Sequence, residues 1–156
     1  MTRTDAPRTD ATPSSTANPA TSTALADMDI TGTLIERMEI ELGEVDARRV
    51  TASMPVAGNT QPYGLLHGGA SAVLAETVGS VAAATHAAGT GQERIAVGVE
   101  LSCSHHRSAR TGSVHAVAEA IHLGGSLATY DIRITDDEGR LVCTARLTCM
   151  IRDARA

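Results

Sequence analysis

The sequence predicts an α+β domain in which one long central helix packs against an antiparallel sheet of about six strands. Six stretches alternate apolar and polar residues with the period of a β-strand, and one Ala-rich stretch, residues 69–88, is apolar on nearly every face. Strands that precede and follow a single helix, without repeated strand-helix alternation, are typical of this fold class.

Two strands are predicted before the helix and four after it. Residues 34–42 and 50–56 alternate in period two, apart from a misplaced Glu36, and the short G-E-V-D-A link between them favours a hairpin. After the helix, strands are predicted at 95–103, 114–120, 128–134 and 141–151. In the first of these four, the apolar residues predicted to share one face are Ile95, Val97, Val99, Leu101 and Cys103.

Composition defines the domain and excludes several functions. Residues 1–27 are mostly Thr, Ala, Ser and Pro, so we expect a disordered tail before a single domain over residues 28–156. No segment is predicted to be a secretory signal or to span a bilayer, so we expect a soluble, cytoplasmic protein without a membrane partner. The net charge of −5 argues against nucleic acid. The three Cys form no C-x-x-C pair and the six His lack zinc-like spacing, so no metal site is predicted.

A single carboxylate in the predicted helix is the strongest functional signal. Glu76 is the only formally charged residue between 65 and 88, and a carboxylate removed from water is unfavourable unless it is paired or protonated. Two Gly residues follow His67 where the helix should begin, so unpaired N–H groups and the positive end of the helix dipole lie upstream of the acid. N–H groups that stabilise an oxyanion, together with a carboxylate that attacks or activates water, favour chemistry at a carbonyl group.

The element order, the sequence G-L-L-H-G-G-A and an acid nine residues after the His resemble the hotdog fold. Within that fold, residues 30–152 are similar to acyl-CoA thioesterases of the 4-hydroxybenzoyl-CoA and phenylacetate-degradation type. The resemblance implies that Glu76 is the nucleophile or general base and that the backbone N–H of Gly68 polarises the thioester carbonyl. It also implies that Gln61 assists the carbonyl or the water, and that Ser80 supports the acid from one helical turn away.

The resemblance further implies that coenzyme A lies along the subunit surface, with its phosphates held by Arg side chains and a turn. The residues at comparable places are Arg107, Gly125, Ser126 and Arg152, with Arg110 or Arg155 as substitutes. Coenzyme A is then part of the substrate, and no separate cofactor is expected. Other interpretations stay open: His67 fits a structural residue at the helix N-terminus as well as a substrate-binding one, and Gln61 fits an exposed loop.

Helix geometry predicts the assembly. Eight residues separate Gly68 from Glu76, which at ~1.5 Å per residue is roughly 12 Å along the helix axis. A thioester carbonyl must lie within about 3 Å of both groups, so one chain cannot supply both. A two-fold dimer with antiparallel helices would bring Gly68 of one chain opposite Glu76 of its partner. We therefore expect an obligate homodimer, and the resemblance suggests a dimer of dimers, a homotetramer.

These inferences predict a thioester hydrolase that cleaves acyl-CoA to a free acid and coenzyme A. The resemblance points to an aromatic acyl group such as hydroxybenzoyl, phenylacetyl or dihydroxynaphthoyl, but the chain has no Phe or Trp to stack on a ring. Two alternatives stay open: a hotdog enoyl-thioester hydratase or dehydratase, and a non-catalytic acyl-CoA-binding sensor. The H-F-P-G-type sequence of the hydratases is missing, and a sensor needs no reactive carboxylate.

Overall fold

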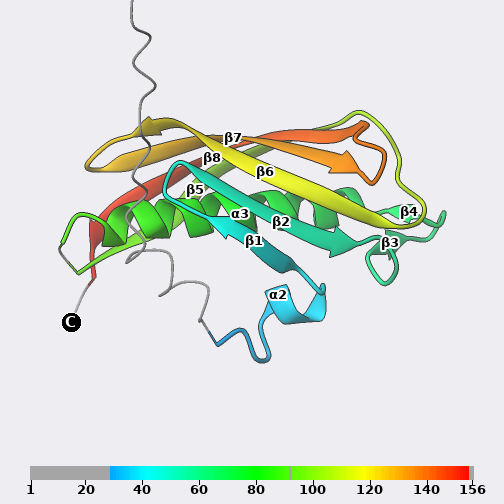
Figure 1. Cartoon of the computed structure of the whole chain (residues 1–156), viewed down its shortest axis with the longest axis horizontal. Coiled ribbons are helices and arrows are strands. Elements are labelled where there is room, and N and C mark those ends of the chain that lie inside the picture. Colours follow the sequence, from blue (N-terminus) through cyan, green and yellow to red (C-terminus); the bar gives the residue numbers. More distant parts are fainter. Residues whose placement is uncertain (1–28, 92, 155–156) are drawn as a thin grey trace, which may run out of the picture.

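The computed structural model of the protein describes residues 29–91 and 93–154. Its main sheet has six antiparallel strands in the order β1-β2-β6-β7-β8-β5, and the long helix α3 (Gly68–Ala88) lies across one face of it (Figure 1). The strands are β1 (Glu41–Val45), β2 (Arg49–Pro55), β5 (Arg94–His105), β6 (Ser113–Leu123), β7 (Leu127–Asp136) and β8 (Leu141–Asp153). The predicted α+β architecture is therefore confirmed. The predicted tail, residues 1–27, lies outside the described residues.

The first predicted strand is wrong over its first half. Residues 34–37 form the short helix α2 (Leu34–Arg37), and β1 begins only at Glu41. Glu39 has a φ of 53°, in the left-handed region, so the chain turns there instead of continuing as a strand. The turn is closed by a hydrogen bond of 3.0 Å from the Ile40 N–H to the Ile35 carbonyl, and Ile40 is buried.

Helix α3 approaches the sheet closely because its buried face is made of small residues. Gly79 faces Leu147 of β8, and a Cβ atom added to Gly79 would lie 2.5 Å from the Cδ2 of Leu147. The residues of α3 that are buried are Ala70, Ser71, Leu74, Ala75, Val78, Gly79, Ala82, Ala83, Thr85 and Ala87. The opposite face, which includes Val73 and Glu76, is only half-buried in the single chain. A helix without a polar face is thus covered on one side only.

Strand β5 is one edge of the sheet, and it does not keep one apolar face as predicted. Its pairing with β8 shifts register between Gly98 and Glu100, which is a β-bulge. Before the bulge, Ile95 and Val97 are 39% and 43% exposed, whereas Leu101 beyond it packs against the core. One extra residue in a strand reverses the alternation of its side chains, so the five apolar residues divide between two faces.

Two very short strands lead into the helix. β3 (Thr60–Gln61) and β4 (Leu65–Leu66) pair with each other and form a separate small sheet that the sequence did not predict. The Leu66 N–H donates to the Ala109 carbonyl at 2.8 Å, in the segment that connects β5 to β6. The N-terminus of α3 is thereby fixed beside that segment.

Candidate active site

The N-terminus of α3 leaves one backbone N–H group available. His67 is the N-cap residue: its Nδ1 accepts a hydrogen bond of 2.8 Å from the Gly69 N–H, and its carbonyl accepts from Ala70 and Ser71. The Gly68 N–H has no acceptor among the residues that the structure describes. The ring of His67 therefore takes the structural position that the sequence left open, and Gly68 holds the free donor.

The free N–H belongs to a residue that lines a cavity of about 370 Å³. Beside Gly68, the cavity is lined by His105, His106, Arg107 and Ser108 from the end of β5 and the segment after it. The ring of His105 contacts the helix N-terminus, since its Nε2 is 3.0 Å from where a Cβ of Gly68 would stand. Sequence reasoning considered His105 only as a metal ligand and missed it here. The available signal was its place at the end of a strand, on the helix-facing side.

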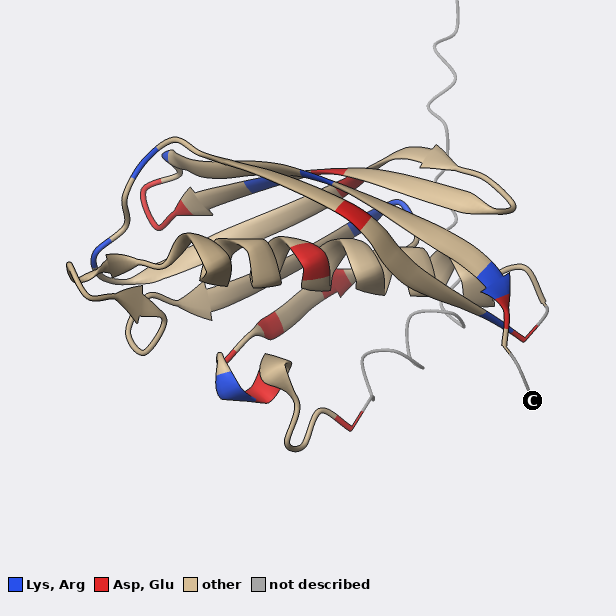
Figure 2. Ribbon diagram, turned by 180° about the vertical axis from the view of Figure 1, so that it is seen from behind, with Lys and Arg blue, Asp and Glu red and all other residues tan. Residues whose placement is uncertain are grey.

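Glu76 lies further along α3 and does not line this cavity. It is the only Asp, Glu, Lys or Arg residue of α3, which otherwise carries no charged segment in Figure 2. Its side chain is half-buried, and Ser80 Oγ donates a hydrogen bond of 3.1 Å to its Oε1. The carboxylate lies over Gly98 of β5, where a Cβ atom would be 3.1 Å from the Glu76 Cδ. Glu76 and Ser80 thus come together as the helical spacing predicts.

The three thiols are not competing nucleophiles. Burial raises the pKa of Cys143 to about 11, and burial with the nearby Glu76 carboxylate raises that of Cys149 to about 11. Burial also raises the pKa of Cys103, the half-buried thiol of β5. All three are protonated near neutral pH, and only a thiolate is strongly nucleophilic.

Gln61 occupies the small β3 strand. Its Oε1 accepts a hydrogen bond of 3.0 Å from the Tyr63 N–H, and its side chain is half-buried. It does not line the cavity beside Gly68. Within one chain, the structure therefore brings together Glu76 with Ser80, but neither of them with Gln61 or Gly68.

The residues expected to hold coenzyme A fall at two ends of the sheet. Arg107 follows the end of β5 and lines the cavity, whereas Arg152 pairs with Ile95 at the start of β5. Gly125 and Ser126 form the exposed turn between β6 and β7, beside Arg152, because the Ile151 N–H donates to the Ser126 carbonyl at 2.8 Å. Since β5 has 12 residues, the two ends are more than about 30 Å apart. One chain does not bring all four together.

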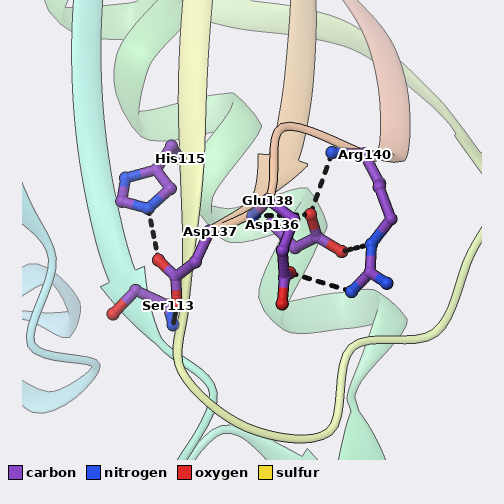
Figure 3. A network of polar contacts seen from close by, with 6 residues as sticks. All are labelled: Ser113, His115, Asp136, Asp137, Glu138 and Arg140. Atoms are coloured by element: carbon purple, nitrogen blue, oxygen red, sulfur yellow. Dashed lines mark hydrogen bonds and ion pairs between the residues drawn. The ribbon is translucent and has the colours of Figure 1, made fainter.

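A polar network fixes the far end of the segment that carries Arg107 (Figure 3). Asp137 Oδ1 contacts His115 Nε2 at 2.7 Å, and its Oδ2 accepts from the Ser113 N–H at 3.0 Å. Hydrogen bonds from His115 and Ser113 hold the pKa of Asp137 below its usual range. Beside it, Arg140 Nε donates to the buried Asp136 at 2.7 Å. The network ties the β7–β8 hairpin to the start of β6 and was not predicted.

One helix across a six-stranded antiparallel sheet, with a carboxylate and a free N–H on that helix, defines the hotdog class of thioesterases. The chain belongs to the Thioesterase superfamily, whose family model matches residues 63–143.

Two relatives with curated names agree with this class. The proofreading thioesterase EntH of Cronobacter turicensis is 44% identical over 121 residues, which are 77% of this chain and 86% of that protein. The 1,4-dihydroxy-2-naphthoyl-CoA hydrolase of Escherichia coli is 42% identical over 121 residues, 77% of this chain and 87% of that protein. The expectation of a thioester hydrolase is therefore confirmed.

Solved structures agree with the fold. A variant of the thioesterase PA1618 from Pseudomonas aeruginosa is 42% identical, with a TM-score of 0.73 over 78% of this chain and 87% of that chain. A variant of the protein SAV0944 from Staphylococcus aureus is 38% identical, with a TM-score of 0.73 over 78% of this chain and 99% of that chain.

Two other features are absent from residues 29–91 and 93–154. No helix there is both long and apolar enough to cross a membrane. No three His, Cys, Asp or Glu side chains in this part of the chain are grouped so that they could hold a metal ion.

Proposed function

We propose that this protein hydrolyses aromatic acyl-CoA thioesters to the free acid and coenzyme A, with Glu76 as nucleophile or general base. The observation that carries the proposal is the pair of groups on α3: a half-buried carboxylate held by Ser80, and a free N–H at Gly68 beside a cavity. The aromatic acyl group is supported by the E. coli relative, whose name specifies 1,4-dihydroxy-2-naphthoyl-CoA.

The chemistry follows from these two groups. A thioester oxygen at the Gly68 N–H receives a hydrogen bond and the positive end of the helix dipole, which stabilise the negative charge that develops on it. The partner's Glu76 carboxylate then attacks the carbonyl carbon, and the thiolate of coenzyme A leaves. Water hydrolyses the resulting acyl-enzyme anhydride to the acid. In the other route, Glu76 takes a proton from a water molecule that attacks directly.

Names of two solved structures support the choice of Glu76 and Gln61. The S. aureus protein was solved as a glutamate-to-alanine variant and as a glutamine-to-alanine variant. In that protein, the two substituted positions have the same separation in sequence as Gln61 and Glu76. If the partner's Gln61 lies near the thioester carbonyl, its side-chain amide is a second hydrogen-bond donor to the carbonyl oxygen, beside the Gly68 N–H.

The site is proposed to form between two chains. The outer edge of β5 is unpaired and half of α3 is uncovered in the single chain, so both are available to a partner. If two β5 strands pair antiparallel about a two-fold axis, the end of each lies beside the start of the other. Gly68 then approaches the Glu76 of its partner. By the same symmetry, Arg107 approaches the partner's Arg152 and its β6–β7 turn.

The first test is release of free thiol from a panel of acyl-CoA substrates, with wild type and Glu76→Gln. We expect hydrolysis of 4-hydroxybenzoyl-CoA and 1,4-dihydroxy-2-naphthoyl-CoA faster than of medium-chain aliphatic substrates, and a loss of at least about 1000-fold in kcat for the variant. Glutamine keeps the size of the side chain, so the variant should melt close to wild type. An active Glu76→Gln protein would refute the proposal, as would hydration of enoyl-CoA without thiol release, or binding without turnover.

The second test asks whether the site is shared between chains. Gly68→Pro removes the donor N–H at the first helical position, where proline is accepted, and Glu76→Gln removes the carboxylate. Each variant alone should be inactive. After unfolding and refolding of an equal mixture, half of the dimers are mixed and each carries one intact site, so roughly a quarter of wild-type activity should return. No recovery in verified mixed dimers would contradict a shared site. Light scattering on the same samples distinguishes a dimer from the expected dimer of dimers.

A further inference from the structure

The residue of the sheet that lies directly under the Glu76 carboxylate is Gly98, in the edge strand β5. A Cβ atom on Gly98 would collide with Glu76 Oε1, and it would lie 3.1 Å from the Cδ and 3.4 Å from Oε2. The backbone of Gly98 does not have a positive φ, so its conformation is open to any residue. Glycine is thus required here for space, and the space is occupied by the proposed reactive group.

The two oxygens of this carboxylate have different surroundings. Oε1 accepts the hydrogen bond of 3.1 Å from Ser80 Oγ and lies directly over Gly98. No hydrogen bond to Oε2 is formed by the residues that the structure describes. One oxygen is therefore held by Ser80 of the helix, above Gly98, and the other is left for the reaction.

The β-bulge explains how this position comes to face the helix. Register shifts between Gly98 and Glu100, so Gly98 and Leu101 both lie on the helix side, opposite Cys149 and Leu147 of β8. Val99 is the extra residue and is 52% exposed. Bulges are known to redirect side chains next to active sites. In this protein the bulge comes directly after Gly98, in the strand at the edge of the sheet.

We propose that Gly98 is a positioning residue for hydrolysis: it leaves the space in which Ser80 can hold Oε1 of Glu76, and so leaves Oε2 as the reacting oxygen. This inference rests on the proposed function, since it assigns the orientation of the carboxylate that the proposed reaction uses. Gly98 has no side chain that could contact substrate and acts only through Glu76. A methyl group at this position moves the carboxylate, which is the flexible end of its side chain, rather than the backbone.

The experiment is a double-mutant cycle with Gly98→Ala and Glu76→Asp, measured by thiol release from 4-hydroxybenzoyl-CoA. Gly98→Ala should lower kcat about 100-fold, because a misplacement of about 1 Å is enough for such a loss, and leave KM within about twofold. Aspartate is shorter, so its carboxylate avoids the collision that the added methyl group would make with Oε1 of Glu76. Glu76→Asp should therefore lower kcat strongly in the wild-type background and much less, or not at all, in the Gly98→Ala background.

A matched control separates this effect from ordinary strain. Gly43 lies in β1, at the other edge of the sheet, and a Cβ there would stand 2.6 Å from Thr51 Oγ1. Gly43→Ala should lower the melting temperature by an amount similar to Gly98→Ala while kcat stays at the wild-type value. The double variant lacks the collision, so it keeps the comparison available if Gly98→Ala alone folds poorly.

Two results would overturn the inference. Wild-type kcat in Gly98→Ala shows that the glycine does not position the carboxylate, and kcat losses that simply multiply in the double variant show that the two residues act independently. Either result with an inactive Glu76→Gln protein leaves the proposed function standing. A fully active Glu76→Gln protein instead refutes the proposed function itself.

Discussion

The substitution Gly79→Ala tests why a long helix can lie so close to the sheet. Two opposing effects are expected. Alanine is a better helix former than glycine by about 1 kcal/mol, which stabilises α3. The added methyl group, however, would lie 2.5 Å from the Cδ2 of Leu147 and 3.3 Å from its Cβ. Because the Cβ is fixed to the strand backbone, a change of rotamer cannot relieve both contacts.

The magnitude follows from the difference between these effects. Leu147 is fully buried, and overpacking in such a core destabilises by typically about 1–3 kcal/mol. After subtraction of the helix-propensity gain, Gly79→Ala should lower the free energy of unfolding by about 1 kcal/mol. Urea unfolding followed by circular dichroism, at one protein concentration for all variants, measures this difference.

The sign should reverse when Leu147 is shortened. Leu147→Ala alone should destabilise by about 2–5 kcal/mol, because it leaves a cavity under the helix. In that background the methyl group of Gly79→Ala has room, so it should stabilise by about 1 kcal/mol. Equal stabilisation by Gly79→Ala in both backgrounds would refute the close contact between helix and strand, since propensity alone would then account for the result.

Two further predictions concern polar contacts. Ser80→Ala removes the only hydrogen bond to the Glu76 carboxylate in the described part of the chain and should lower kcat about tenfold with little change in KM; an unchanged kcat would show that Ser80 is not needed to orient the acid. Asp137 has a pKa below its usual range because of its hydrogen bonds with His115 and Ser113, so it stabilises the fold above about pH 4, and this stability is lost as the pH falls through the lowered value. Asp137→Asn should therefore reduce the melting temperature at pH 7 and flatten its decline in acid, and parallel curves for the two proteins would contradict this.

The sequence predicted the fold well because most of the sheet buries every second residue against one helix. In β7, for example, Tyr130, Ile132 and Ile134 are all fully buried, as their alternation predicts. The alternation did not predict the β-bulge in β5. Apolar residues continue at every second position through the bulge, so the sequence gives no sign that the later ones face the other side of the sheet. It also failed before β1, where a turn at Glu39 interrupts an alternation that looks continuous in the sequence.

The candidate site was predictable only where its members are neighbours on one element. Glu76 and Ser80 follow from the helical period, and Gly68 from its place at the start of the helix. The contact of His105 with Gly68 joins the end of a strand to the start of a helix. Strand alternation indicates which side of the sheet His105 faces, but not that it meets Gly68. The separation of Arg107 from Arg152 likewise depends on the strand pairing rather than on spacing along the chain.

The strand order has a consequence for how the chain folds during translation. β5 has a single sheet neighbour, β8, which is synthesised only after β6 and β7. In a nascent chain that lacks residues 141–153, β5 has no strand of its own chain to pair with, and Gly79 has no Leu147 to pack against. Such distant pairings slow folding, because a long loop must close before they form. We therefore expect β5, which carries Gly98, to become ordered late. A ribosome-bound chain without β8 then has no ordered strand under Glu76.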